Sequence, residues 1–319
     1  MAVLDLIIIG AGPAGLTAAQ YSARAKLKTL VIEMLSVGGQ AVIIDVLENY
    51  PGNIGQIDMS GKETPPKSGY ELALDLHRQA ESFGASFLNN KVKLIKKIDK
   101  LFEVYLDDET THITPALIIA TGAKPRLLGI PGEDSFTGRG VSYCATCDGN
   151  FFKEKKIFAV GGGDAACDEA RYLSNLTKKV ILVHRRDSFR AQKALAARTL
   201  ENPNIEVRFN TTIEEIKGEQ KVKSVVLKRA DNGEIYEEDA DAVFIFAGTV
   251  PQTSVVNGLD VEKNTDGYII VNHKMQTNIQ GLYAAGDVRA DAFRQVVTAA
   301  ADGAVAAHNA SKYIDEIKY

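Results

Sequence analysis

The segment Leu4-Asp-Leu-Ile-Ile-Ile9 runs directly into Gly10-Ala-Gly-Pro-Ala-Gly15. An apolar strand that stops at closely spaced glycines, a helical pattern over Pro13–Arg24 and a second apolar strand over Lys28–Ile32 predict a βαβ unit. The glycines permit a tight turn and let a pyrophosphate approach the backbone N–H groups at the start of the helix. The sequence therefore predicts a dinucleotide site here, and the alternative is a turn with a purely structural role.

Glu33 follows the second strand of this unit. A carboxylate at this spacing can accept hydrogen bonds from ribose hydroxyls, which favours an adenosine without a 2′-phosphate, as in FAD or NAD. The acid strengthens the dinucleotide hypothesis over the structural alternative.

The same pattern occurs again in the middle of the chain, with a strand over Lys156–Val160, a helix over Asp164–Leu173 and a strand over Lys179–Val183. The turn between the first two reads Gly161-Gly-Gly-Asp-Ala-Ala166, with alanine where a third glycine is common. The second strand ends in basic residues, His184-Arg185-Arg186 and then Arg190, instead of an acid. Guanidinium groups suit a 2′-phosphate, so this unit predicts NADPH, and the alternative is a solvated basic turn.

Two segments with the same pattern flank this second unit. Residues 117–125 and residues 243–251 are each an apolar strand that ends in glycine and then proline. We expect them to carry the chain between two domains, an FAD-binding domain of residues 1–117 and 247–319 and an NADPH-binding domain of residues 118–246. The predicted fold class is α/β, with two Rossmann-like dinucleotide-binding domains, the first of them discontinuous.

Composition excludes several other classes. The chain has 319 residues, 45% of them hydrophobic, and a net charge of −4, which gives no reason to expect a nucleic-acid partner. The apolar run Leu6–Ile9 is too short for a membrane span or a signal peptide, so we expect a cytoplasmic protein with no membrane contact. Three cysteines are too few for a disulfide scaffold, and two that lie close together in a reducing compartment indicate redox chemistry.

The close pair is Cys144-Ala-Thr-Cys147, followed by Asp148 and Gly149. Two cysteines at this spacing can close a reversible disulfide, and one sulfur must become a thiolate to exchange with an external disulfide. Asp148 is well placed to manage that proton, although it could instead cap or turn the chain before Gly149. A zinc site is disfavoured because the only other cysteine, Cys167, falls within the predicted helix and is expected to be a packing residue.

Near the C-terminus, Gly281-Leu-Tyr-Ala-Ala-Gly-Asp287 is predicted to be a strand that ends at Gly286 and Asp287, and a helix of small residues is predicted to begin at Arg294. With a bound flavin, Asp287 could bond the ribityl chain while residues 294–296 approach the isoalloxazine. Packing alone is the alternative. Residues 53–69 contain glycines and two prolines, which predict an irregular loop of undetermined function.

Together GAGPAG, GGQ at residues 38–40, ENYPG at residues 48–52, CATCDG, HRRDSFRA and AAGDV resemble the bacterial-type thioredoxin reductases, nearly end to end. The resemblance implies FAD in the first domain, NADPH in the second, Cys144 and Cys147 as the redox disulfide, Asp148 as the acid/base and thioredoxin as the partner. It also implies a homodimer whose second domain rotates between two working positions. The loop after Pro51 is longer than the family pattern leads us to expect, and His308 is expected to be a surface residue with no catalytic role.

The motifs and the resemblance together assign a set of cofactor-binding positions. In the first domain they are Gly10, Gly12, Pro13, Ala14, Gly15, Glu33, Gly39, Gln40, Asn49, Val92, Thr121, Gly122, Gly286, Asp287, Arg294, Gln295 and Val296; in the second they are Gly161, Gly163, Asp164, Ala165, Ala166, Glu169, His184, Arg185, Arg186 and Arg190. Our hypothesis is electron transfer from NADPH through FAD and the disulfide to thioredoxin, with Cys144 attacking the partner and Cys147 facing the flavin. The alternatives are an NADPH-dependent reductase of another thiol partner, a dithiol oxidase, a ferredoxin-fed reductase, and a flavin-binding redox sensor with little turnover.

Overall fold

The computed structural model describes residues 4–44, 46–47, 49–55 and 64–318. Within them the chain forms two compact units, residues 1–124 with 250–319 and residues 125–249. We call them unit 1 and unit 2. The expected boundary lies seven residues earlier at the first place, 118 against 125, and three residues earlier at the second, 246 against 249.

Unit 1 is built on a parallel sheet with the strand order β18-β7-β1-β2-β3. The central strand β1 is buried along its whole length, which explains why its sequence is apolar without alternation. The five strands are β1 (Leu6–Ile9), β2 (Thr29–Glu33), β3 (Ser86–Asn89), β7 (Ala116–Ile119) and β18 (Leu282–Ala284).

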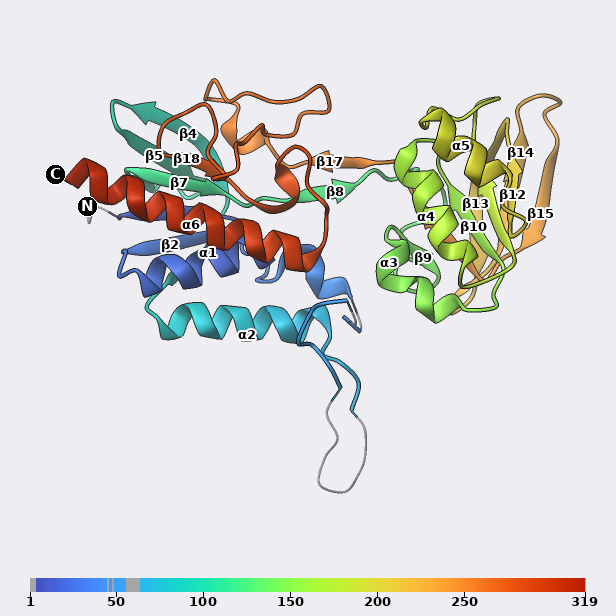
Figure 1. Ribbon diagram of the computed structural model, residues 1–319, viewed down its shortest axis with the longest axis horizontal. Helices are drawn as coiled ribbons and strands as arrows, with labels where there is room; N and C mark the ends of the chain where they lie inside the picture. Colours follow the sequence, from blue (N-terminus) through green and yellow to red (C-terminus); the bar gives the residue numbers. More distant parts are fainter. Residues whose placement is uncertain (1–3, 45, 48, 56–63, 319) are drawn as a thin grey trace. The chain divides into compact units, whose positions relative to one another are not determined.

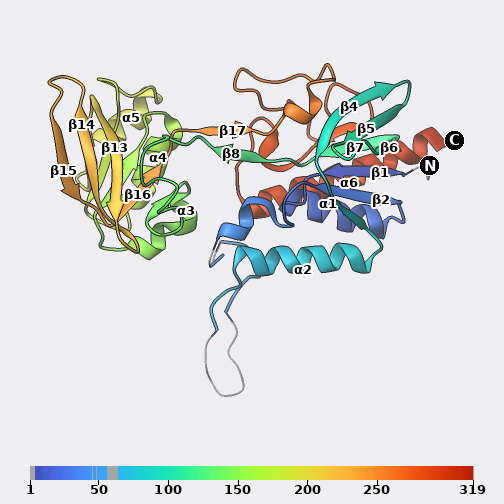
Figure 2. The same cartoon turned by 180° about the vertical axis from the view of Figure 1, so that it is seen from behind.

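Different layers cover the two faces of this sheet (Figures 1 and 2). Leu6 and Ile8 face a core made with helices α1 (Pro13–Arg24), α2 (Gly69–Ser82) and α6 (Val296–Lys318). Ile7 and Ile9 face a second core made largely with an antiparallel sheet of β4 (Val92–Ile98), β5 (Leu101–Leu106) and β6 (Thr111–Thr114). Short 3₁₀ helices, η1 (Gly39–Ile43), η3 (Ser254–Val256) and η4 (Gly286–Val288), complete the unit.

Unit 2 repeats this plan. Its parallel sheet has the order β12-β11-β10-β16-β9, made of β9 (Val141–Ser142), β10 (Ile157–Val160), β11 (Val180–Val183), β12 (Ile205–Arg208) and β16 (Ala242–Ile245). One face packs on α3 (Ala145–Asp148), η2 (Gly149–Phe152), α4 (Asp164–Ser174) and α5 (Lys193–Leu200). The other packs on an antiparallel sheet of β13 (Thr211–Gly218), β14 (Val222–Arg229) and β15 (Ile235–Asp239).

The two segments that share a sequence pattern do connect the units. Each contains a sheet strand, β7 or β16, and then a short strand, β8 (Ala123–Pro125) or β17 (Thr249–Pro251), and the two short strands form a two-stranded sheet of their own. Gly122 and Gly248 have positive φ angles of 70° and 94°, which glycine adopts without strain, and this explains the shared glycine.

Most predicted element boundaries agree with the structure to within one or two residues. The helix expected from Arg294 begins instead at Val296, because the carbonyl of Gln295 accepts the first intrahelical bond, from the Ala299 N–H at 2.9 Å. Cys167 is fully buried and His308 is exposed, as expected. The predicted loop over residues 53–69 lies partly outside the described residues, namely at 56–63.

Neither a membrane span nor a metal-binding cluster is found among the described residues. No helix there is both long enough and apolar enough to cross a membrane. No group of three or more His, Cys, Asp or Glu side chains in the described part of the chain could hold a metal ion.

Candidate active site

The glycine turn of unit 1 lies between β1 and α1, with Gly12 as the N-cap and Pro13 in the first turn of the helix. A Cβ on Gly15 would lie 1.8 Å from the carbonyl oxygen of Gly10, so only glycine allows the helix to approach the turn this closely. A Cβ on Gly39 would lie 3.1 Å from the Cα of Gly12, so the two glycine backbones pack closely against each other. This backbone cradle fits a pyrophosphate.

Glu33 is fixed against this turn. Its carboxylate accepts the N–H of Ala11 at 2.8 Å and the N–H of Leu35 at 2.9 Å. A carboxylate has about four acceptor positions, so these bonds orient the group and leave capacity for ribose hydroxyls.

Hydrogen bonds within unit 1 fix further predicted positions. Gln40 donates to the carbonyl of Ala123, and the Thr121 hydroxyl donates to the carbonyl of Gln252 at 2.6 Å. The amide of Asn49 donates to the side chain of Gln295 at 3.0 Å, which links the ENYPG motif to the residue that precedes α6. Val92 differs from this group because its side chain packs in the apolar core beneath the antiparallel sheet.

The turn of η4 carries Gly286 and Asp287. Burial, above all, raises the pKa of the Asp287 carboxyl. Asp302 on α6 accepts the Gly286 N–H at 3.2 Å and a bidentate ion pair from Arg289, at 2.6 and 3.1 Å. The ion pair therefore attaches the turn to α6.

The glycine turn of unit 2 lies between β10 and α4. A Cβ on Gly163 would meet nothing within 4 Å, so the start of α4 borders open space. The N–H of Arg190 donates to the carbonyl of Gly162 at 2.7 Å, and Asp164 accepts the N–H of Gln192 at 2.7 Å. These bonds fold the basic segment back onto the glycine turn.

The basic residues divide by burial. Arg185, Arg186 and Arg190 are exposed, whereas His184 is buried. Its imidazole ring packs against Gly162, because a Cβ added to that glycine would lie only 2.2 Å from the ring. Burial first, and then the neighbouring arginines, lower the pKa of His184. The imidazole is therefore neutral at pH 7, and the positive charge of the segment is carried by the three arginines.

Cys144 and Cys147 form a disulfide, with Cα atoms 5.3 Å apart, at the start of α3. The Cys144 sulfur accepts the N–H of Cys147 at 3.2 Å, so Cys144 is the N-cap of this helix. The carboxylate of Asp148 accepts the hydroxyl of Ser142 at 2.6 Å, and Ser142 in turn accepts the N–H of Cys144 at 3.2 Å. The acid is thus connected to the redox pair through one serine, a residue that the sequence analysis missed.

Glu169 bonds to the backbone between the two cysteines. Its carboxylate accepts the N–H of Ala145 at 3.1 Å, and its role in nucleotide binding stays a prediction. This contact could not be predicted from sequence, because the two residues lie 24 positions apart along the chain.

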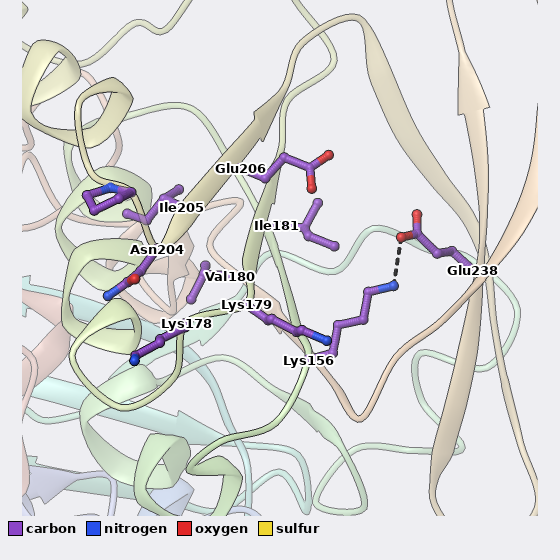
Figure 3. Close-up of a pocket in the computed structure, with 10 residues that line it drawn as sticks. Lys156, Lys178, Lys179, Val180, Ile181, Asn204, Ile205, Glu206 and Glu238 are labelled. Carbon is purple, nitrogen blue, oxygen red and sulfur yellow. Dashed lines mark hydrogen bonds and ion pairs between the residues drawn. The ribbon is translucent and has the colours of Figure 1, made fainter.

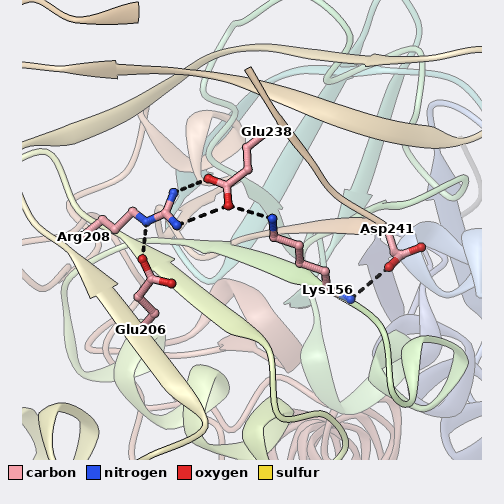
Figure 4. A network of polar contacts seen from close by, with 5 residues as sticks. All are labelled: Lys156, Glu206, Arg208, Glu238 and Asp241. Carbon is pink, nitrogen blue, oxygen red and sulfur yellow. Dashed lines mark hydrogen bonds and ion pairs between the residues drawn. The ribbon is translucent and has the colours of Figure 1, made fainter. Parts of the chain in front are cut away.

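A separate polar cluster lies at the amino-terminal edge of the unit 2 sheet, opposite its glycine turn. A cavity of about 380 Å³ opens beside it and is lined by Lys156, Lys178, Lys179, Val180, Ile181, Pro203, Asn204, Ile205, Glu206 and Glu238 (Figure 3). Glu238 joins Lys156 at 2.7 Å to Arg208, which also bonds Glu206 at 2.6 Å (Figure 4). None of these residues belongs to the predicted site, so we assign the cluster to stability.

Comparisons with known proteins agree with this geometry. The family model for pyridine nucleotide-disulphide oxidoreductases matches residues 4–303. A thioredoxin reductase of Treponema pallidum is 52% identical over 314 residues, which cover 98% of each chain, and one of Peptoclostridium acidaminophilum is 44% identical over 319 residues with the same coverage. The crystal structure of thioredoxin reductase from Streptococcus pyogenes superposes with a TM-score of 0.89 at 39% identity and covers 99% of each chain.

Two glycine turns and a disulfide occur on one chain. Together with the family match, they place the protein in the class of flavin- and nicotinamide-dependent disulfide oxidoreductases. The chain belongs to the pyridine nucleotide-disulphide oxidoreductase family and, within it, to the thioredoxin reductases.

Proposed function

We propose that the chain reduces oxidised thioredoxin with electrons from NADPH, by way of FAD and the disulfide between Cys144 and Cys147. The observation that supports this most directly is that disulfide, held at the start of a helix beside a carboxylate, on the same unit as a basic nucleotide turn. Relatives that are up to 52% identical to this chain are thioredoxin reductases.

In the proposal, FAD is held by the first set of residues. The cradle of Gly10, Gly12 and Gly15 would take the pyrophosphate, Glu33 the adenosine ribose and Asp287 the ribityl hydroxyls, with residues 294–296 beside the ring. When bound, the flavin supplies the chemistry that converts a hydride into electrons for a disulfide. The Asp287 carboxyl is partly buried, so a hydrogen bond from a ribityl hydroxyl would be stronger there than in open water.

NADPH is assigned to unit 2. The turn of Gly161 and Gly163 would take the pyrophosphate, and Arg185, Arg186 and Arg190 the 2′-phosphate. Two observations support this assignment. All three arginines are exposed, and the backbone N–H of Arg190 is bonded to Gly162 of the glycine turn. Guanidinium groups bind a phosphate through paired charge-assisted hydrogen bonds, which NADH cannot form at this position.

The remaining chemistry belongs to the two sulfurs. Two electrons and two protons convert the disulfide into the Cys144 and Cys147 thiols. Cys144, ionised, attacks one sulfur of the thioredoxin disulfide and forms a mixed disulfide, and the partner's leaving thiolate takes up a proton. Cys147 then attacks Cys144, re-forms the internal disulfide and releases reduced thioredoxin. Asp148 is assigned the proton transfers, since Ser142 holds its carboxylate beside this segment.

We also propose that the enzyme is a cytoplasmic homodimer. Sedimentation velocity of the holoenzyme tests the dimer, because a monomer would sediment as a single 34.5 kDa chain.

Steady-state reduction of thioredoxin, followed by the decrease in NADPH absorbance, tests the proposed activity. Flavin reduction by NADPH without thioredoxin turnover would move the partner to another thiol protein, and turnover with oxygen alone would favour the oxidase.

A further inference from the structure

The side chain of Glu169 on α4 extends to the beginning of α3. Its carboxylate accepts the N–H of Ala145, the residue that follows Cys144, at 3.1 Å. Ala145 is fully buried, and α3 packs directly on α4. A carboxylate therefore lies within hydrogen-bond distance of the residue that adjoins the N-terminal sulfur of the redox pair.

The surroundings of Glu169, which is partly buried, act on the pKa of its carboxyl in both directions. Burial is the main factor that raises the pKa of its carboxyl, and the like charge of Asp168 on the same helix raises the pKa further, while the N–H groups of Ala145 and Thr146 lower it. On α3 the titratable groups are the two cysteines, once reduced, and Asp148, whose carboxylate is bonded to Ser142 of β9. A charge in such a half-buried place is screened less than one in open water.

We propose that Glu169 is a positioning residue for the redox pair, whose carboxylate holds the first turn of α3 and whose negative charge opposes ionisation of the Cys144 thiol. The inference rests on the proposed function in taking Cys144 and Cys147 as the dithiol that two electrons and two protons produce. Loss of one proton from Cys144 would place two negative charges close together, which costs free energy. Glu169 thus limits the thiolate fraction of the attacking cysteine.

Charge and position can be separated by three variants. Glu169→Gln keeps an oxygen acceptor for the Ala145 N–H and removes the charge. Glu169→Asp keeps the charge on a shorter side chain. Asp168→Asn is the matched control, because Asp168 is the neighbouring carboxylate, is 64% exposed and lies 3.8 Å from Arg171.

The experiment measures thiol ionisation directly. Each holoenzyme is reduced with dithiothreitol, freed of it without oxygen and treated with iodoacetamide from pH 5.5 to pH 9, and alkylation of Cys144 is followed by mass spectrometry. We expect Glu169→Gln to react about threefold to tenfold faster than wild type below the inflection and to show an inflection at lower pH. Glu169→Asp should stay closer to wild type than Glu169→Gln does, and Asp168→Asn should stay within about twofold of wild type.

The inference is overturned if Glu169→Gln overlays wild type, if Asp168→Asn shifts the profile as far, or if Glu169→Asp shifts it as far as the uncharged variant. Because dithiothreitol generates the dithiol, these profiles do not depend on NADPH or thioredoxin. Failure of wild type to turn over thioredoxin would therefore refute the proposed function and leave the result on Glu169 standing.

Discussion

Replacing Asp302 by asparagine removes the charge that faces Arg289 beneath the Asp287 turn. Asp302 is 7% exposed, and its carboxylate accepts two bonds from the guanidinium and one from the Gly286 N–H. The substitution leaves a guanidinium that is only 17% exposed without its counter-charge, which costs about 3 kcal/mol in such pairs. With a urea m-value of about 2 kcal/mol/M, the unfolding midpoint should fall by about 1.5 M.

Circular dichroism is the suitable assay, because the chain contains no tryptophan for fluorescence and its longest helices, α1, α2 and α6, all belong to unit 1. Release of flavin, followed by its own fluorescence, should move to lower urea with the same variant, since Asp302 also holds the turn that carries Asp287. Asp315→Asn is the matched control, the same change at an exposed position of α6, and should alter the free energy of unfolding by less than about 0.5 kcal/mol. An Asp302→Asn protein as stable as this control would refute the reasoning.

Three further results are expected. Replacing Arg185 and Arg186 by glutamine should reduce the preference for NADPH over NADH by about 100-fold in kcat/KM, since each lost charge-assisted bond costs about 1.5 kcal/mol; an unchanged preference would contradict the assignment. Glu238→Gln should lower the free energy of unfolding at pH 7 by about 1 kcal/mol. The Arg208 hydrogen bond lowers the pKa of Glu238 to about 2, so this stability is present above the ordinary value of 4.5 and lost as pH falls toward 2, and denaturation curves of variant and wild type should converge there; a constant gap would contradict it. Cys147→Ser should abolish charge-transfer absorbance with the flavin while Cys144 still forms a mixed disulfide with thioredoxin, and the reverse pattern would exchange the two roles.

The parallel sheets could be predicted from sequence because their signals are local. Leu6–Ile9 is buried on both sides, so its apolar run is continuous, and Gly15 is required by a contact only a few residues away. The repeated segments at residues 117–125 and 243–251 were recognisable for the same reason, and they became the paired connecting strands β8 and β17.

The contacts between elements could not be predicted in this way. Glu169 looked like part of a nucleotide-binding helix, and only the packing of α4 on α3 brings its carboxylate to Ala145. The Arg289–Asp302 pair likewise depends on how α6 passes the η4 turn. The antiparallel sheets were not foreseen either, because in a strand such as β4 lysines and apolar residues mix without strict alternation.

Anaerobic titration of the holoenzyme with NADPH, and separately with NADH, followed by oxidised thioredoxin, follows the whole proposed electron path in one experiment. We expect NADPH to bleach the flavin absorbance, NADH to do so poorly, and thioredoxin to restore the absorbance as its own disulfide is reduced. Absence of bleaching by NADPH would contradict the assignment of the arginines, and bleaching that thioredoxin cannot reverse would contradict the assignment of the partner.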